Sequence, residues 1–182
     1  MAWRLNKTIV MVGMMGAGKT AVGTQLARDL GVAFLDSDEE IVRAANLSVT
    51  EIFERYGEPF FREKEAQVLA RLLDGQPGVL STGGGAFLRE ANRAMIHERG
   101  VSVWLRADLA LLWARVRHKA TRPLLRTADP KATLAAMFEA RVPVYALADL
   151  AVDAQPDYAI DEMADKVTEA LVSRRPDVLE RV

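Results

Sequence analysis

The chain has 182 residues, with 24 basic and 25 acidic side chains and a formal net charge of −1. This balance gives no reason to expect nucleic acid or an anionic membrane as a partner. There is no cysteine, which excludes disulfides and thiolate metal sites and fits a cytoplasmic protein. The length and the 50% share of hydrophobic residues predict a single domain over 1–182.

Short apolar runs alternate with amphipathic segments along the chain. The apolar runs predict five buried strands, at Thr8–Gly13, Val32–Asp36, Gly78–Thr82, Gly100–Leu105 and Leu150–Ala154. The amphipathic segments predict helices at Thr20–Leu30, Glu39 to about Leu73, Asp108 to about Arg117, Pro130–Leu147 and Asp161–Ser173. Breaks are expected near Ser48, at Gly57–Pro59 and at Pro143. The alternation predicts an α/β fold with a five-stranded parallel sheet flanked by helices.

The segment from Gly13 to Thr20 matches the phosphate-binding pattern G-x-x-x-x-G-K-[ST], between a predicted strand and a predicted helix. Glycines in such a loop let backbone N–H groups face phosphate oxygens, and the helix N-terminus adds partial positive charge. The pattern therefore predicts a nucleoside triphosphate, expected to be ATP. We expect it to contact Gly13, Gly16, Ala17, Gly18, Lys19, Thr20 and Ala21.

Polar clusters follow two other predicted strands, at the edge where parallel sheets bind ligands. Asp36 and Asp38 lie two residues apart and could serve two neighbouring points, a hydrated cation and a hydroxyl donor. Asp38 could equally front the next helix, for which Ser37 is a candidate N-cap. Gly83–Gly85 follow the third strand. Three consecutive glycines lose much conformational entropy on folding, so they are expected there only if a ligand or side chain must approach the backbone closely.

Several arginines have two readings. By local sequence, Arg62 is a helix residue paired with Glu58 or Glu65. A basic run is either a solvated loop or a lid facing a polyanionic nucleotide, and it contains Arg115, Arg117, Lys119, Arg122 and Arg126.

Taken together, the segments VGMMGAGKT, LDSD, FFREKE, STGGGAF, RVRHKATRPLL and EARVPVY resemble those of shikimate kinases, in the same order and at similar spacing, from about Ile9 to Ala170. The resemblance implies a three-layer P-loop kinase fold with a core of about 7–172. It also implies an acceptor-binding helical region of about 38–74 and a mobile lid of about 117–130.

The resemblance also implies roles for single residues. Asp36 would order the shell of one Mg²⁺ through water, together with Thr20, and Asp38 would hold the acceptor hydroxyls. The acceptor carboxylate would be bound by Arg62 and Arg141, the latter near an expected helix kink.

Gly83, Gly84 and Gly85 would let the acceptor ring and the γ-phosphate approach the backbone. Arg115, Gln155 and Pro156 would contact the adenine end of the nucleotide. The catalytic residues would be Lys19, Asp38 and Arg122.

The implied reaction is ATP-dependent phosphorylation of shikimate at its 3-hydroxyl by a cytoplasmic monomer, with no nucleic acid or membrane partner. Another small-molecule P-loop kinase acting on a hydroxy acid is one alternative, and a catalytically inactive nucleotide-binding relative is another. The set Asp38, Arg62 and Arg141 argues against a kinase for gluconate or a nucleoside monophosphate. The tail 174–182 could be disordered or packed on the core.

Overall fold

The computed structural model of this chain describes residues 2–118 and 127–182. Arg122 and most of the lid predicted for about 117–130 therefore lie outside the described residues. Within the described part, no helix is long and apolar enough to cross a membrane.

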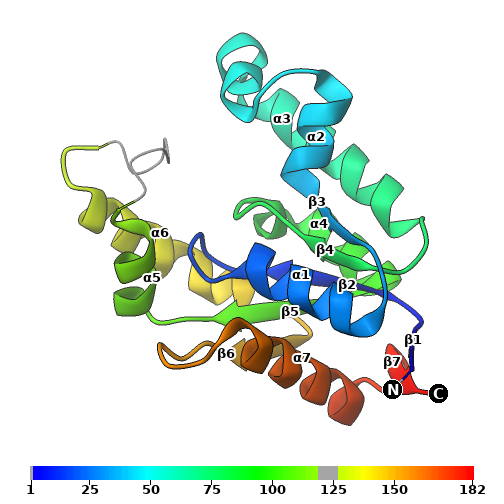
Figure 1. Ribbon diagram of the computed structural model, residues 1–182. Helices are drawn as coiled ribbons and strands as arrows, with labels where there is room; N and C mark the ends of the chain where they lie inside the picture. Colours follow the sequence, from blue (N-terminus) through cyan, green and yellow to red (C-terminus); the bar gives the residue numbers. More distant parts are fainter. Residues whose placement is uncertain (1, 119–126) are drawn as a thin grey trace.

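A five-stranded parallel sheet forms the centre of the molecule (Figure 1), in the order β3-β4-β2-β5-β6. All five predicted strands are confirmed; the fourth is one residue longer than predicted, and the other four are one or two residues shorter. Every residue of the central strand β2 is buried, because helices cover both faces of the sheet. The bounds are β2 Thr8–Val12, β3 Phe34–Asp36, β4 Val79–Ser81, β5 Gly100–Arg106 and β6 Leu150–Asp153.

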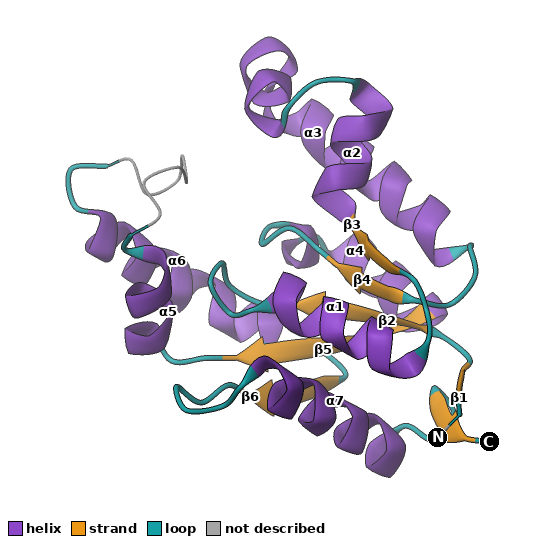
Figure 2. Cartoon of the chain, in the orientation of Figure 1, coloured by secondary structure: helices purple, strands orange, loops and turns teal. Residues whose placement is uncertain are grey.

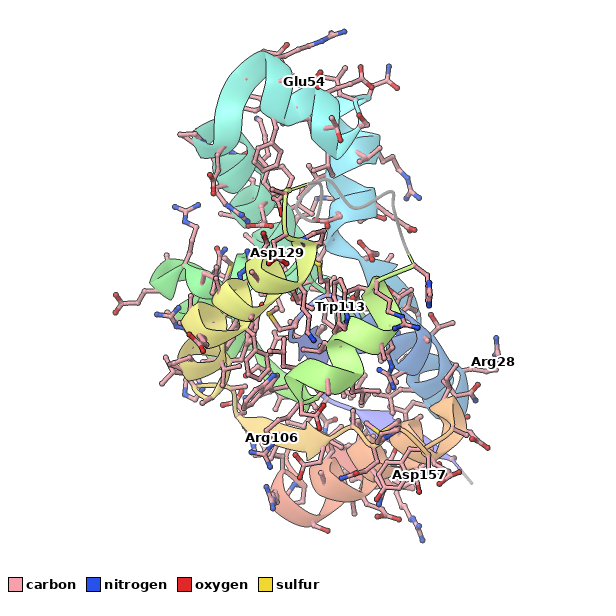
Figure 3. All side chains as sticks on the ribbon, turned by 90° about the vertical axis from the view of Figure 1, so that its left-hand side faces the viewer. Arg28, Glu54, Arg106, Trp113, Asp129 and Asp157 are labelled. Atoms are coloured by element: carbon pink, nitrogen blue, oxygen red, sulfur yellow. The ribbon has the colours of Figure 1, made fainter. Side chains whose placement is uncertain are left out.

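Helices on the two faces complete the three predicted layers (Figure 2). On one face α1 (Lys19–Leu30) lies beside α7 (Ile160–Arg174), and the other face carries α4 (Glu90–Arg99) and α6 (Pro130–Tyr145). Figure 3 looks onto α6 and its neighbour α5 (Leu109–Val116).

One helix, α4, was not predicted from the sequence. Only Asn92 and Ile96 of this helix are buried, so the sequence shows no long apolar face there. Its N-cap, Arg89, makes no side-chain capping hydrogen bond, so the sequence also lacks the usual N-cap residue. A short 3₁₀ turn, η1 (Ala86–Leu88), precedes it.

Two helices, α2 (Ser37–Ala45) and α3 (Val49–Leu73), project from the sheet on the side of β3 and β4 (Figure 1). Ser48 and Glu51 form a reciprocal capping box at the start of α3, which explains the predicted break there. Inside α3, Gly57 adopts φ 82° and ψ 171°, which is the second predicted break. These helices have a small core separate from that of the sheet, made of Ile41, Ile52, Phe61 and Val68.

Two local expectations are wrong. Asp36, not Ser37, caps α2, because its Oδ1 accepts hydrogen bonds from the Asp38 and Glu39 backbone amides at 2.9 and 3.2 Å. The second is the break expected at Pro143, because α6 continues through this residue as one helix and Arg141 therefore lies inside that helix; the alternative, a kink at Pro143, stays a prediction.

The two ends of the chain pair with each other. β1 (Trp3–Leu5) and β7 (Leu179–Arg181) form a two-stranded antiparallel sheet, and the termini lie side by side in Figure 1. Val178 and Leu179 are fully buried in the main core. Of the two alternatives for the tail, packing on the core is therefore the one found.

Candidate active site

A cavity of about 790 Å³ opens along the carboxyl edge of the sheet. The loop before α1, the start of α2, the middle of α3, the segment after β4, and α6 all contribute to its wall. Most of the residues singled out in the sequence line it, namely Gly16, Ala17, Gly18, Lys19, Thr20, Ala21, Asp36, Asp38, Arg62, Gly83, Gly84, Gly85, Arg115 and Arg141.

The loop between β2 and α1 has the conformation expected of a phosphate-binding loop. Gly13, Gly16 and Gly18 have φ values of 144°, 82° and 97°, a region that residues with side chains rarely occupy. Gly18 is the N-cap of α1 and has no side chain, so the N-cap itself does not occupy the amides of the first turn. The Lys19 Nζ donates to the carbonyls of Gly13 and Met14 at 2.6 and 3.1 Å, which places its charge over the loop.

Arg115 connects this loop to α5. Its Nη1 donates to the Gly16 carbonyl at 3.0 Å, across 99 positions of sequence. The guanidinium thus borders the nucleotide end of the cavity, and its predicted contact with adenine remains a prediction.

Three charged side chains lie against three consecutive glycines at the other end of the cavity. A β-carbon at Gly83 would lie 2.8 Å from Asp38 Oδ1, and one at Gly84 would lie 2.8 Å from Arg141 Nη1. One at Gly85 would lie 2.5 Å from Arg62 Nη1. These distances are too short for real contacts, and none of the three glycines has a positive φ. Their function is therefore to leave room for the charged groups, rather than to permit an unusual backbone.

Burial sets the electrostatics of Asp38. Desolvation raises the pKa of its carboxyl above the ordinary value of 3.8, and Asp36 adds to this, while Lys19 and Arg62 oppose it. Within the described residues, its Oδ1 is buried and accepts no hydrogen bond. An unpaired buried acceptor is costly, and a bound hydroxyl group would satisfy it.

Arg62 is held by two glutamates of its own helix, the pairing that local sequence predicted. Its Nη1 contacts Glu65 Oε1 at 3.0 Å and its Nε contacts Glu58 Oε1 at 3.4 Å. Glu65 is fully buried, and burial raises its pKa above the ordinary 4.5, an effect that Arg62 opposes. Arg62 nevertheless also lines the cavity, and its predicted contact with the acceptor carboxylate remains a prediction.

Other residues of the cavity carry no local signal in the sequence. Val49, Phe53 and Phe61 border the end of the cavity where Arg62 lies. Tyr158 and Met163, which follow β6 in the chain, also line the cavity. Apolar residues at helical spacing resemble ordinary core positions, so only the fold shows that they face a cavity.

Three predicted nucleotide contacts do not line the cavity as described. Gln155 and Pro156 are exposed beside it, where their neighbours Ala154 and Tyr158 form the wall. Gly13 lies at the start of the loop, where its carbonyl accepts from Lys19. Arg122 falls outside the described residues.

Comparison with known proteins identifies relatives over nearly the whole chain. The family model for shikimate kinase matches residues 15–172. A shikimate kinase of Cereibacter sphaeroides is 70% identical over 97% of this chain and 88% of its own length, and one of Ruegeria pomeroyi is 68% identical over 97% and 90%.

Solved structures agree. Shikimate kinase from Acinetobacter baumannii, in complex with shikimate, has a TM-score of 0.86 and 37% identity, covering 93% of this chain and 94% of that one. A gluconokinase from Sinorhizobium meliloti has a TM-score of 0.60 and 18% identity over 96% of both chains, which shows a shared fold alone.

The buried charge of Glu65 predicts a pH-dependent stability difference. Its folded pKa is raised, so the ionised form destabilises the fold, and this cost sets in as the pH rises above 4.5. We expect Glu65→Gln to gain Tm relative to the parent as the pH rises from about 4.5 to 7. Thermal unfolding across this range measures the difference.

The matched control is Glu58→Gln, which removes the exposed partner of the same guanidinium. Its difference from the parent should stay small, because exposed ion pairs contribute little. If the Tm difference for Glu65→Gln moved in the parent's favour with rising pH, the assignment of a burial cost to Glu65 would be wrong.

Proposed function

Because the chain belongs to the shikimate kinase family, we propose that it transfers the γ-phosphoryl group of ATP to the 3-hydroxyl of shikimate, giving shikimate 3-phosphate and ADP. The observation that carries the proposal is the convergence of Asp38, Arg62 and Arg141 on Gly83–Gly85, in the cavity that the phosphate-binding loop also lines. A carboxylate and two guanidinium groups are the partners that a hydroxylated carboxylic acid needs. The relative solved with shikimate supports this acceptor.

The acceptor is held by opposite charges at its two ends. Arg62 and Arg141 bind its carboxylate through charge-assisted hydrogen bonds, which are stronger than neutral ones. Asp38 accepts a hydrogen bond from the hydroxyl that reacts. The glycine segment lets the ring approach because no side chain intervenes.

The nucleotide is held by the loop before α1. Its backbone amides and the N-terminus of α1 bind the phosphates, Lys19 contacts the β- and γ-phosphates, and Arg115 contacts the adenine end. Gln155 and Pro156 are proposed to border the adenine. From outside the described residues, Arg122 is proposed to add positive charge at the phosphates.

The donors near the phosphates fit Mg²⁺. Thr20 offers a hydroxyl and Asp36 a carboxylate, which are the hard oxygen donors that this ion prefers. No group of three or more acidic, histidine or cysteine side chains in residues 2–118 and 127–182 could hold a metal, so most ligands would be phosphate oxygens and water. We propose that Thr20 binds the ion directly and Asp36 through water. The ion neutralises phosphate charge when bound.

The reaction is an in-line transfer. The 3-hydroxyl oxygen bonds to the γ-phosphorus while the bond from that phosphorus to the β,γ-bridging oxygen breaks, and ADP leaves. Asp38 orients the hydroxyl and takes its proton, a role that its raised pKa favours. Lys19 stabilises the negative charge on the phosphates, because phosphoryl transfer depends mainly on positioning and charge.

We further infer a cytoplasmic monomer. The charged groups proposed to bind the acceptor, Asp38, Arg62 and Arg141, all belong to one chain, so the proposed site requires no residue of a second copy. The use of ATP and the absence of cysteine support the cytoplasm.

Replacing Lys19 tests the reaction itself. We expect Lys19→Met to reduce turnover of shikimate on the order of 10²-fold or more, because a preorganised charge at a developing anion is lost. A coupled ADP-release assay measures turnover, and thermal unfolding checks the fold. Lys131→Met, an exposed lysine on α6, is the matched control and should match the parent. Lys19→Met activity within a few-fold of the parent would exclude this role for Lys19, and a parent inactive on shikimate would exclude the proposed reaction.

Gly85→Ala tests whether the glycines make room for the charged groups. The new β-carbon would displace the end of the Arg62 side chain, which is flexible, so we expect the fold to survive. The shikimate KM should rise roughly 10- to 100-fold, as for a lost hydrogen bond to a charged group, and the ATP KM should hardly change. Gly75→Ala, where a β-carbon has ordinary space, is the control. A normal shikimate KM in Gly85→Ala would contradict the assignment.

Arg62 and Arg141 lie 79 positions apart, and combining each single variant with a modified substrate tests whether both bind the same carboxylate. Arg62→Ala and Arg141→Ala should each weaken use of shikimate by about 2–5 kcal/mol, or roughly 30- to several-thousand-fold, with ATP binding nearly unchanged. The parent enzyme should use shikimate methyl ester less efficiently than shikimate by a comparable factor. With either variant, the drop in efficiency from shikimate to its methyl ester should be smaller than with the parent, because one charged contact is already gone. Penalties that simply add would mean that these arginines do not bind the carboxylate.

A further inference from the structure

The helix α6 reaches the glycine segment with two side chains. Arg141 and Tyr145 lie four residues apart and therefore on the same face of α6. A β-carbon at Gly84 would lie 2.8 Å from Arg141 Nη1 and 3.7 Å from the Tyr145 hydroxyl oxygen. Both side chains thus meet the middle glycine of the three, and α6 also packs against η1, which follows them.

The Tyr145 hydroxyl donates a hydrogen bond to the Gly84 carbonyl at 2.6 Å. Its ring is 1% exposed and packs beside Trp104, with centroids 6.2 Å apart. The carbonyls of the flanking glycines accept only short-range bonds, Gly83 from the Ala86 amide and Gly85 from the Leu88 amide. Within residues 2–118 and 127–182, the Tyr145 hydrogen bond is thus the one that connects Gly83–Gly85 to an element distant in sequence.

Such an anchor matters because glycine is the most flexible residue. Three glycines in a row have no side chain that could fix their backbone by packing. Fixing the Gly84 carbonyl also fixes the peptide plane that carries the Gly85 amide. The same bond holds α6, and with it Arg141, at a set distance from the segment against which Asp38 and Arg62 lie.

We propose that Tyr145 is a positioning residue that holds Arg141 and Gly83–Gly85 in register, and thereby sets the affinity for the acceptor without touching the reacting atoms. This proposal rests on the proposed function for its acceptor. Burial raises the pKa of the Tyr145 phenol above its ordinary 10.0, and Arg141 opposes this effect. The hydroxyl accordingly stays protonated and able to donate at neutral pH.

The test removes the hydroxyl and keeps the ring. Tyr145→Phe should raise the shikimate KM about tenfold, as for the loss of one buried hydrogen bond, while kcat and the ATP KM change less than twofold. Tyr56→Phe makes the same chemical change at a tyrosine that is 55% exposed on α3, and it should match the parent. A simple packing defect would lower Tm and affect both substrates alike, and that result would overturn the proposal.

A second measurement does not depend on catalysis. Hydrogen exchange in the free protein should become faster in Tyr145→Phe for the peptide spanning 83–88, and stay unchanged for the peptide spanning 13–20. Unchanged exchange over 83–88 would overturn the anchoring role, whatever the kinetics. If the parent failed to phosphorylate shikimate, the proposed function and the acceptor role of Tyr145 would both be excluded, and the exchange result would decide the anchoring alone.

Discussion

The acceptor end of the cavity depends on one steric constraint, the absence of three consecutive side chains at Gly83–Gly85. Each missing β-carbon leaves space that a charged group occupies, so Asp38, Arg62 and Arg141 can crowd around one short stretch of backbone. Because the segment follows β4 at the carboxyl edge of the sheet, it also faces the phosphate-binding loop that follows the neighbouring strand β2. The sheet thereby brings the phosphate-binding loop and the three charged side chains to one cavity, and the glycines let those side chains converge there.

This convergence carries an electrostatic cost. Burial raises the pKa of both Asp38 and Glu65, which means that their ionised forms are held in surroundings that disfavour them. Arg62 offsets part of this cost for both carboxylates, and Lys19 does so for Asp38. A site of this kind is less stable than an apolar one of the same shape, and such trade-offs are typical of functional sites. The same cost leaves Asp38 Oδ1 with an unmet hydrogen bond that an acceptor hydroxyl can complete.

The parts of the site that the sequence revealed are those whose chemistry is local. Gly13–Thr20 form one continuous loop between a strand and a helix, so residue spacing alone predicted the nucleotide end. Arg62 and Arg141 look like ordinary helix residues, and only the resemblance to a family gave them a common role. Tyr145 carried no signal at all, because its partner lies 61 positions away and is a backbone atom. The missed helix α4 has a similar cause, since propensities are weak where tertiary contacts decide the outcome. The wrong N-cap has a local cause, because Asp36 and Ser37 are adjacent and both residue types are good N-caps.

The helices α2 and α3 share a small core, and the end of α3 joins them to the main core of the sheet. Ile41, Ile52, Phe61 and Val68 form a cluster of their own, while the last turns of α3 place Leu69 and Leu73 in the main core. The nucleotide loop, in contrast, joins β2 to α1 at the centre of the main core. A gluconokinase at 18% identity shares this fold alone. Fold alone therefore leaves the acceptor open, and the assignment to a hydroxylated carboxylic acid depends on the charged groups around Gly83–Gly85.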